Sequence, residues 1–444
     1  MSFIAPAAGL VAWEWFSIFS PHLMVFGFAR GQPFNELIAI ATLGGWLLSR
    51  ERKSFPTDAL PWMMLLFCIW VTFNGLFVPI PDVAWHYWGL IMKIFVGTFL
   101  AFMLLTTKAR IHAMIWTLVI SVGYYGMRGG IYTLATLGNG HVIGPMGTML
   151  GDNNSIALIE VMTIPLLYYL AKHTQHLLVR LGLIAGFILQ ILSVFGSYSR
   201  GGIIALCVVL LMFWLRVKNK ITYAIAGIAV LGFATSIMPA AFWERMDTLH
   251  NVSADSSFEG RVQAWHVAYW YANAHFPFGA GFYSLQVPQL WHQFYPDSVQ
   301  HAAHSIYFQV LGEHGYPGLA IYLVILFLAL RNARFVMRRT RDNPELEWLN
   351  DLARMITAGL ISYYVGGAAL SLAYFDGFLM LIALTSTMRE MAIRCTTPAA
   401  NRTTTVQHIR ARPTVPVTAR TRQPLPQVLP NLRRGTAPFG ESDL

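Results

Sequence analysis

The sequence predicts an all-α polytopic membrane protein, and three observations lead to this fold class. Of its 444 residues, 55% are hydrophobic and only 12% are charged, and the mean hydropathy is +0.50. A soluble globule of this length carries about twice that share of charged residues on its surface. The apolar residues gather in runs of about 20 residues, the length that a helix needs to cross about 30 Å of hydrocarbon.

These runs predict about twelve transmembrane helices, of which the second and the eighth are short for a full span. They lie near residues 5–28, 34–49, 60–78, 86–106, 110–127, 155–172, 177–196, 202–216, 221–240, 304–330, 354–373 and 375–393. The chain then divides into a first block of helices at 1–238, a large external loop at 239–303, a last group of helices at 304–394 and a tail at 395–444.

The basic residues predict the orientation of these helices. Of the 31 Lys and Arg residues, 25 fall on alternate loops or on the tail, so the positive-inside rule places these loops and both termini in the cytoplasm. This distribution accounts for the net charge of +10 without a nucleic-acid partner. The six exceptions are Arg30, Lys93, Arg128, Arg200, Arg245 and Arg261. Five of the six lie on or beside the external face, where we look for a site.

The segments between and after the apolar runs carry further signals. The tail at 395–444 is rich in Pro, Thr and Arg and lacks apolar periodicity, which predicts a disordered basic segment that rests on anionic lipid. The loop at 239–303 is long enough to contain helices of its own. Within it, one predicted amphipathic helix over 260–274 would lie along the membrane surface. Its apolar face would consist of Val262, Trp265, Tyr269 and Ala272.

Two external arginines are candidate anion-binding residues. Arg200 lies in the tight link 197–202 between two apolar runs, where an arginine costs about 2.5–3.5 kcal/mol on insertion scales and by default marks a site. The alternative is an arginine that reaches lipid phosphate from a helix end. Arg261 follows Glu259 in the large loop, where the alternative is a weak surface ion pair.

His304 is the candidate general base because it precedes an apolar helix on the external face. The positive end of a helix disfavours imidazolium, so a histidine there is biased toward the neutral form that accepts a proton. One alternative is a hydrogen bond to a backbone carbonyl, and another is a metal site shared with His301. No nearby carboxylate supplies a convincing third ligand, and the chain has no Asp-x-Asp pair. We therefore expect no metal and no cofactor.

Two further cations are possible auxiliary residues. Lys93 lies inside the fourth apolar run, where its charge is costly, and it either points into a cavity that holds phosphate or extends to the interface. Arg128 is a further external cation in the sequence Met127–Gly130. The three cysteines have no CxxC spacing and indicate neither a disulfide framework nor a zinc site.

Several motifs resemble those of a known family. His304 and Ser305, followed after nine residues by the segment 315–318, resemble the signature of the O-antigen ligase (WaaL) family, whose superfamily includes the Wzy O-antigen polymerases. The Pro- and Gly-rich segment 277–281 is similar to an element that precedes this signature. Arg200 and Arg261 match the positions of two external arginines of the family. The N-terminal block resembles the branch labelled O-glycosylation ligases.

This resemblance implies a GT-C-like helical enzyme of lipopolysaccharide biosynthesis at the periplasmic face of the bacterial inner membrane. It implies metal-independent, inverting transfer of a preassembled glycan from undecaprenyl diphosphate to a sugar hydroxyl of lipid A-core. His304 would then be the base, and Arg200 and Arg261 would bind the diphosphate, with Lys93, Arg128 and His301 as possible auxiliary residues.

Three other functions stay open at this point. An O-antigen polymerase and a protein O-oligosaccharyltransferase use the same chemistry with another acceptor. A transporter of lipid-linked glycan should instead carry charges along the interior of several helices, whereas the unusual charges here gather at one face.

Overall fold

The computed structural model describes residues 2–28, 30–51, 53–217, 219–247 and 256–397, and these residues form helices without any strand. Every predicted apolar run contains a helix, and the all-α class is confirmed. The helices in these runs are α1 (Pro6–Phe19), α2 (Phe34–Leu48), α3 (Ala59–Asn74), α4 (Pro81–Leu104), α5 (Lys108–Ala135), α6 (Asn153–His173), α7 (Leu177–Gly196), α8 (Arg200–Trp214), α9 (Lys220–Ser236), α13 (Ile306–Arg339), α14 (Glu347–Gly366) and α15 (Asp376–Thr396). Three more helices lie between α9 and α13, namely α10 (Ala240–Asp247), α11 (Ser256–Ala274) and α12 (Pro288–Trp291).

Four of the described helices, α4, α6, α7 and α13, are long and apolar enough to cross a membrane. The pair α9 and α10, which is bent by 108°, would make a fifth span. The helices α2, α3 and α8 are apolar but have only 15, 16 and 15 residues, short of the length of about 20 that a full span needs. The protein is an all-α membrane protein, and the figure of twelve spans stays a prediction.

Several predicted helix boundaries are wrong. Helix α1 ends at Phe19 and does not continue to residue 28, because Ser20 is left-handed with φ of 48° and Pro21 follows. Helix α5 continues to Ala135, so Arg128 lies inside a helix with its side chain exposed. The predicted tail begins within α15, and residues 398–444 lie outside the described part of the chain.

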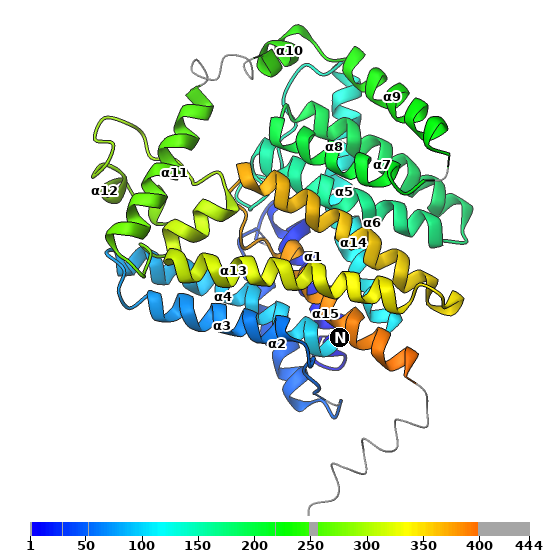
Figure 1. The fold of residues 1–444 in the computed structure, drawn as a ribbon, viewed down its shortest axis with the longest axis horizontal. Helices are drawn as coiled ribbons and strands as arrows, with labels where there is room; N and C mark the ends of the chain where they lie inside the picture. Colours follow the sequence, from blue (N-terminus) through cyan, green and yellow to red (C-terminus); the bar gives the residue numbers. More distant parts are fainter. Residues whose placement is uncertain (1, 29, 52, 218, 248–255, 398–444) are drawn as a thin grey trace, which may run out of the picture. The chain divides into compact units, whose positions relative to one another are not determined.

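Helix α13 lies at the centre of the helix packing. It contacts α3, α14 and α15 along its length and α11 near its start, and Figure 1 shows it in yellow between α14 and α3. Far from its start, the buried Asp58 caps α3 by accepting a hydrogen bond from the Leu60 N–H at 3.0 Å. The same carboxylate accepts from Asn332 of α13 at 2.8 Å and from the Ser386 hydroxyl of α15. Asp58 therefore ties three helices together.

The helix predicted in the large loop exists as α11, but only part of its predicted apolar face is buried. The buried apolar residues are Ala264, Val267, Ala268, Tyr271 and Ala272. Of the predicted face, Ala272 is buried, Val262 and Trp265 are half-buried, and Tyr269 is exposed. The reason is steric, because alanines allow α11 to lie close to α13. A Cβ atom added at Gly312 of α13 would be 3.0 Å from the Cβ of Ala268. Together with α12, this face forms a second hydrophobic core beside the main one.

Candidate active site

His304 lies just before α13 in a left-handed backbone conformation with φ of 44°. Such a conformation costs a residue other than glycine about 1–3 kcal/mol, so surrounding contacts must hold it. The His304 N–H donates to the Ser371 hydroxyl at 2.6 Å. The next residue, Ser305, caps α13 by accepting from the Phe308 N–H at 3.4 Å. These contacts fix the direction in which the imidazole leaves the backbone.

The surroundings of His304 favour its neutral form. Burial lowers the pKa of His304 from its usual 6.5 to about 4, and the positive charge of Arg261 and the neighbouring His301 add to this effect. Asp152 acts in the opposite direction. These electrostatic couplings show that the structure brings Arg261, His301 and Asp152 around His304. At neutral pH, His304 can therefore accept a proton.

Arg261 and His301 lie where α11 meets the segment before α13. The indole N–H of Trp265 donates to the Ala303 carbonyl at 2.9 Å. The ring of His301 lies against Gly260, where an added Cβ atom would be 2.9 Å from its Nε2. This ring also packs edge-on against Trp291, with centroids 5.5 Å apart. Within the described ranges, no group of three His, Cys, Asp or Glu side chains could hold a metal ion.

Arg200 is the first residue of α8, and the start of α6 lies between this helix start and His304 in a chain of interactions. Its neighbour Ser199 is the α8 cap and donates its hydroxyl to Asn154 at 2.9 Å. The Asn154 N–H in turn donates to the Asp152 carboxylate at 2.8 Å. Asp152 caps α6, and its charge acts on His304. The helices α6, α8 and α13 therefore all begin near one another. Their positive ends and the two arginines suit an anion with several oxygens, such as a diphosphate.

Helix α13 is broken at Gly315, and the loop before it docks into the break. Gly315 has φ of 68°, and a Cβ atom there would lie 2.1 Å from the Pro277 carbonyl oxygen. The Gly281 N–H donates to the Glu313 carbonyl at 2.9 Å. The two Gly-containing motifs that resemble the ligase family therefore pack against each other. Their role in this structure is to shape the backbone beneath the site.

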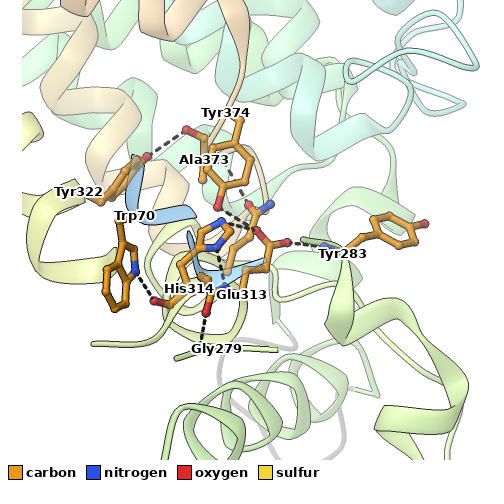
Figure 2. Close-up of polar contacts among 10 residues, drawn as sticks. Trp70, Gly279, Tyr283, Glu313, His314, Tyr322, Ala373 and Tyr374 are labelled. Carbon is orange, nitrogen blue, oxygen red and sulfur yellow. Dashed lines mark hydrogen bonds and ion pairs between the residues drawn. The ribbon is translucent and has the colours of Figure 1, made fainter. Parts of the chain in front are cut away.

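Asn74 and Glu313 satisfy the polar groups that this break exposes (Figure 2). The Asn74 amide donates to the Glu313 carbonyl at 2.9 Å and accepts from the Gly279 N–H at 3.1 Å. The Glu313 carboxylate accepts from the Tyr283 N–H at 3.0 Å and from the Tyr374 hydroxyl at 2.8 Å. One buried carboxylate thus joins the docked loop to the segment between α14 and α15.

The segment between α14 and α15 connects this network to His304. In this segment, the carbonyl of Ala373 accepts a hydrogen bond from the Tyr322 hydroxyl at 3.2 Å (Figure 2). The Ala373 N–H donates to the side-chain oxygen of Gln309 at 3.2 Å. Two residues earlier, Ser371 accepts the His304 N–H. The buried network therefore holds the segment whose Ser371 accepts the His304 N–H, and in this way it helps to fix the backbone of His304.

The other two predicted auxiliary cations occupy other surroundings. Lys93 forms an ion pair with Glu36, with Nζ 3.2 Å from Oε1, and both side chains are about half exposed. Arg128 is exposed on α5. Neither these two cations nor Arg200 is among the groups whose charges act on His304.

Three residues of this region, Asn74, Glu313 and Ser371, are not predicted from the sequence. For Asn74 and Glu313 a signal existed, because polar residues inside apolar helices are costly and mark functional or structural sites. Ser371 gave no signal, since its role comes only from the tertiary contact with the His304 backbone.

The structure is that of an all-α membrane protein in which a neutral histidine lies beside Arg261 where three helices begin. Residues 185–323, which contain Arg200, Arg261 and His304, match the family described as O-antigen ligase. This match supports an enzyme of the O-antigen ligase and polymerase kind. Residues 1–175 match a family of unknown function (DUF5935). No curated protein matches the chain.

We predict that Gly315→Ala destabilises the fold, because its backbone, with φ of 68° and ψ of −173°, is essentially restricted to glycine and costs another residue about 1–3 kcal/mol. The added Cβ atom would also meet the Pro277 carbonyl. Thermal unfolding in detergent should show a lower melting temperature. The matched control is Gly182→Ala on α7, where an added Cβ atom meets nothing within 4 Å. Equal melting temperatures for both variants would contradict the docking role of Gly315.

We predict that Arg261→Gln raises the pKa of His304 above about 4, because it removes the cation that opposes protonation. The value should stay below 6.5, since burial is the larger cause. Histidine C2 hydrogen–deuterium exchange, followed by mass spectrometry as a function of pH, measures this midpoint for each histidine. The exposed His292 is the internal control, and its midpoint should not change. An unchanged His304 midpoint would mean that Arg261 does not act on it.

Proposed function

We propose that this protein is an O-antigen ligase, which transfers a preassembled glycan from undecaprenyl diphosphate to a sugar hydroxyl of lipid A-core. The observation that carries the proposal is the neutral His304 beside Arg261, within the segment that matches the O-antigen ligase family. Such a histidine has the protonation state of a general base, and the cation beside it suits a diphosphate leaving group.

In the proposed reaction, the imidazole of His304 takes the proton of the acceptor hydroxyl. The acceptor oxygen attacks the anomeric carbon of the donor glycan, and the bond from that carbon to the diphosphate oxygen breaks with its electron pair leaving on the diphosphate. A single displacement of this kind inverts the anomeric configuration. General-base catalysis typically contributes about 10² to 10⁴ in rate.

Arg200 and Arg261 would bind the diphosphate with forked, charge-assisted hydrogen bonds and stabilise the negative charge that develops on it. The bound diphosphate would also offset the positive charge of Arg261, which opposes protonation of His304. His304 would therefore become a stronger base only when the donor is in place.

We further propose a multi-pass inner-membrane location with both termini in the cytoplasm and the site facing the periplasm. The charge distribution supports this orientation, because the basic loops and the His304 segment lie at opposite ends of the predicted spans. The donor and lipid A-core would then meet in the periplasm, which lacks ATP. The reaction would need none, because the diphosphate leaving group of the lipid-linked donor is already activated. His301 would act only by shaping the pocket around His304.

We predict that His304→Ala loses about 10² to 10⁴ in rate in an assay of purified protein in nanodiscs. The assay contains the lipid-linked glycan and lipid A-core, without added metal or nucleotide. His292→Ala, which changes an exposed histidine of the same loop, should keep wild-type activity.

Full activity of His304→Ala would remove the base assignment, and complete loss of wild-type activity with a chelator would contradict the metal-independent mechanism. If the wild-type protein extends the lipid-linked glycan but leaves lipid A-core bare, the protein is a polymerase.

We predict that Arg200→Lys and Arg261→Lys each lower kcat/KM by about ten-fold or more, because hydrogen bonds to charged groups contribute about 1.5–3 kcal/mol and an ammonium lacks the planar fork. The same assay measures this loss over a range of donor concentrations. Arg180→Lys, an exposed position on α7, is the matched control. Wild-type kinetics in both site variants would assign the arginines a structural role.

A further inference from the structure

A cavity with several polar side chains lies among the N-terminal helices, outside the candidate active site. Its volume is about 340 Å³, within the range of about 300–1,000 Å³ that is typical of small-molecule sites. It is enclosed by α1, α2 and α4, by the segment 147–150, and by the start of α15. Residues 277–281, 304–305 and 315–318, which resemble the ligase motifs, contribute nothing to its walls.

The cavity is lined by polar atoms that lack partners among the described residues. Glu14 is only 5% exposed, yet its Oε1 has no hydrogen-bond partner. The same is true of the Oδ1 atom of Asn35 and the Nδ1 atom of His22. A buried polar group without a partner costs free energy, about 1–3 kcal/mol by mutational measurements. Such groups are expected where a ligand supplies the missing hydrogen bonds.

The chemistry of the lining selects the class of ligand. Glu14 and Asn35 offer unpartnered hydrogen-bond acceptors, whereas Asp376 already accepts from the Ser17 hydroxyl, so the ligand must bring donors. Two carboxyl groups disfavour an anion, and Lys93 at the exposed edge is already paired with Glu36. The residues that the structure describes contain no trio of side chains fit for a metal ion.

Aromatic residues complete the lining. Trp13, Phe16 and Phe375 stand beside the polar groups. Apolar and aromatic walls with a few fixed polar groups are typical of sites that bind small organic molecules. A sugar ring matches this combination, because its hydroxyls donate hydrogen bonds while its C–H face packs on apolar side chains.

The cavity adjoins the candidate active site through two short segments. Leu150 lines the cavity, and Asp152 two residues later acts electrostatically on His304. Asp376 lines the cavity as well, and Ser371 five residues earlier accepts the His304 N–H. These two segments therefore connect the walls of the cavity to groups that act on His304.

We propose that this cavity binds a sugar unit of one of the two glycan substrates, with Glu14 and Asn35 as hydrogen-bond acceptors for its hydroxyls. The assignment of this sugar to a glycan substrate rests on the proposed function. The inference that the cavity binds a sugar rests only on the residues that line it. The sugar could come from the donor glycan or from the core oligosaccharide, and both present the same hydroxyl chemistry.

The test measures binding of free oligosaccharides to the full-length protein in detergent by isothermal titration calorimetry. The probes are core oligosaccharide and O-chain fragments, both released by mild acid from lipopolysaccharide of the cells that carry this protein. Wild type and His304→Ala should bind at least one probe equally well. Glu14→Leu and Asn35→Leu should weaken that binding by ten-fold or more. Glu345→Leu, an exposed glutamate outside the cavity, is the matched control.

Thermal unfolding separates binding from folding in these variants. Replacing an unpartnered buried carboxyl group by an apolar side chain of similar size should leave the melting temperature of Glu14→Leu unchanged or higher. A structural role for Glu14 would lower it instead. If Glu14→Leu does not fold, Asn35→Leu, at the edge of α2, carries the test.

Each outcome supports or overturns the sugar site. Wild-type binding in both leucine variants, or no binding of either probe, would overturn it. Displacement of the oligosaccharide by glycerophosphoethanolamine would assign the cavity to a lipid headgroup instead. Oligosaccharide binding without any transfer activity would keep the site and remove the proposed function. Transfer activity with wild-type KM values in both leucine variants would keep the function and remove the site.

Discussion

The break in α13 at Gly315 is the constraint on which the rest of the site depends. Within an apolar environment, every backbone group that a helix releases must find another partner. Here Gly281 and the amide of Asn74 both donate to the carbonyl of Glu313, so the break is stable only with the loop docked into it. This docking carries α11 to the start of α13, and Arg261 thereby comes to lie near His304.

The electrostatics of the site follow from the same arrangement. Burial and Arg261 both oppose a proton on His304, so the free protein holds a neutral base beside a cation. The starts of α6 and α8 add further positive potential, while Asp152 partly offsets it. A site with this balance is complementary to an anionic leaving group, and its base is strongest after that group has bound. The arrangement thus favours chemistry in the complex over chemistry in the empty site.

The sequence predicts the helices and the charged part of the site, but not the contacts that hold the site together. Apolar run length depends only on local sequence, and Arg200 and His304 are recognisable because charges and histidines are rare at such positions. The partnership of Asn74 and Glu313 joins residues 239 positions apart, which no local pattern reveals. The predicted face of α11 is only partly buried for a related reason. The spacing of large apolar residues predicts the packing face, whereas close approach to α13 selects alanines such as Ala268.

The two matched regions divide the work that a glycan transfer requires. Residues 185–323 contain the proposed base and both arginines, so they supply the chemistry. Residues 1–175 supply α1, α2 and α4 around the cavity among the N-terminal helices, together with Asp152 at its border with the site. Chemistry of this kind is the same for any hydroxyl acceptor, whereas hydrogen bonds from a partly buried cavity discriminate between sugars. With the proposed sugar site, specificity for the glycan would therefore reside in the N-terminal helices, and a change of substrate would require no change around His304.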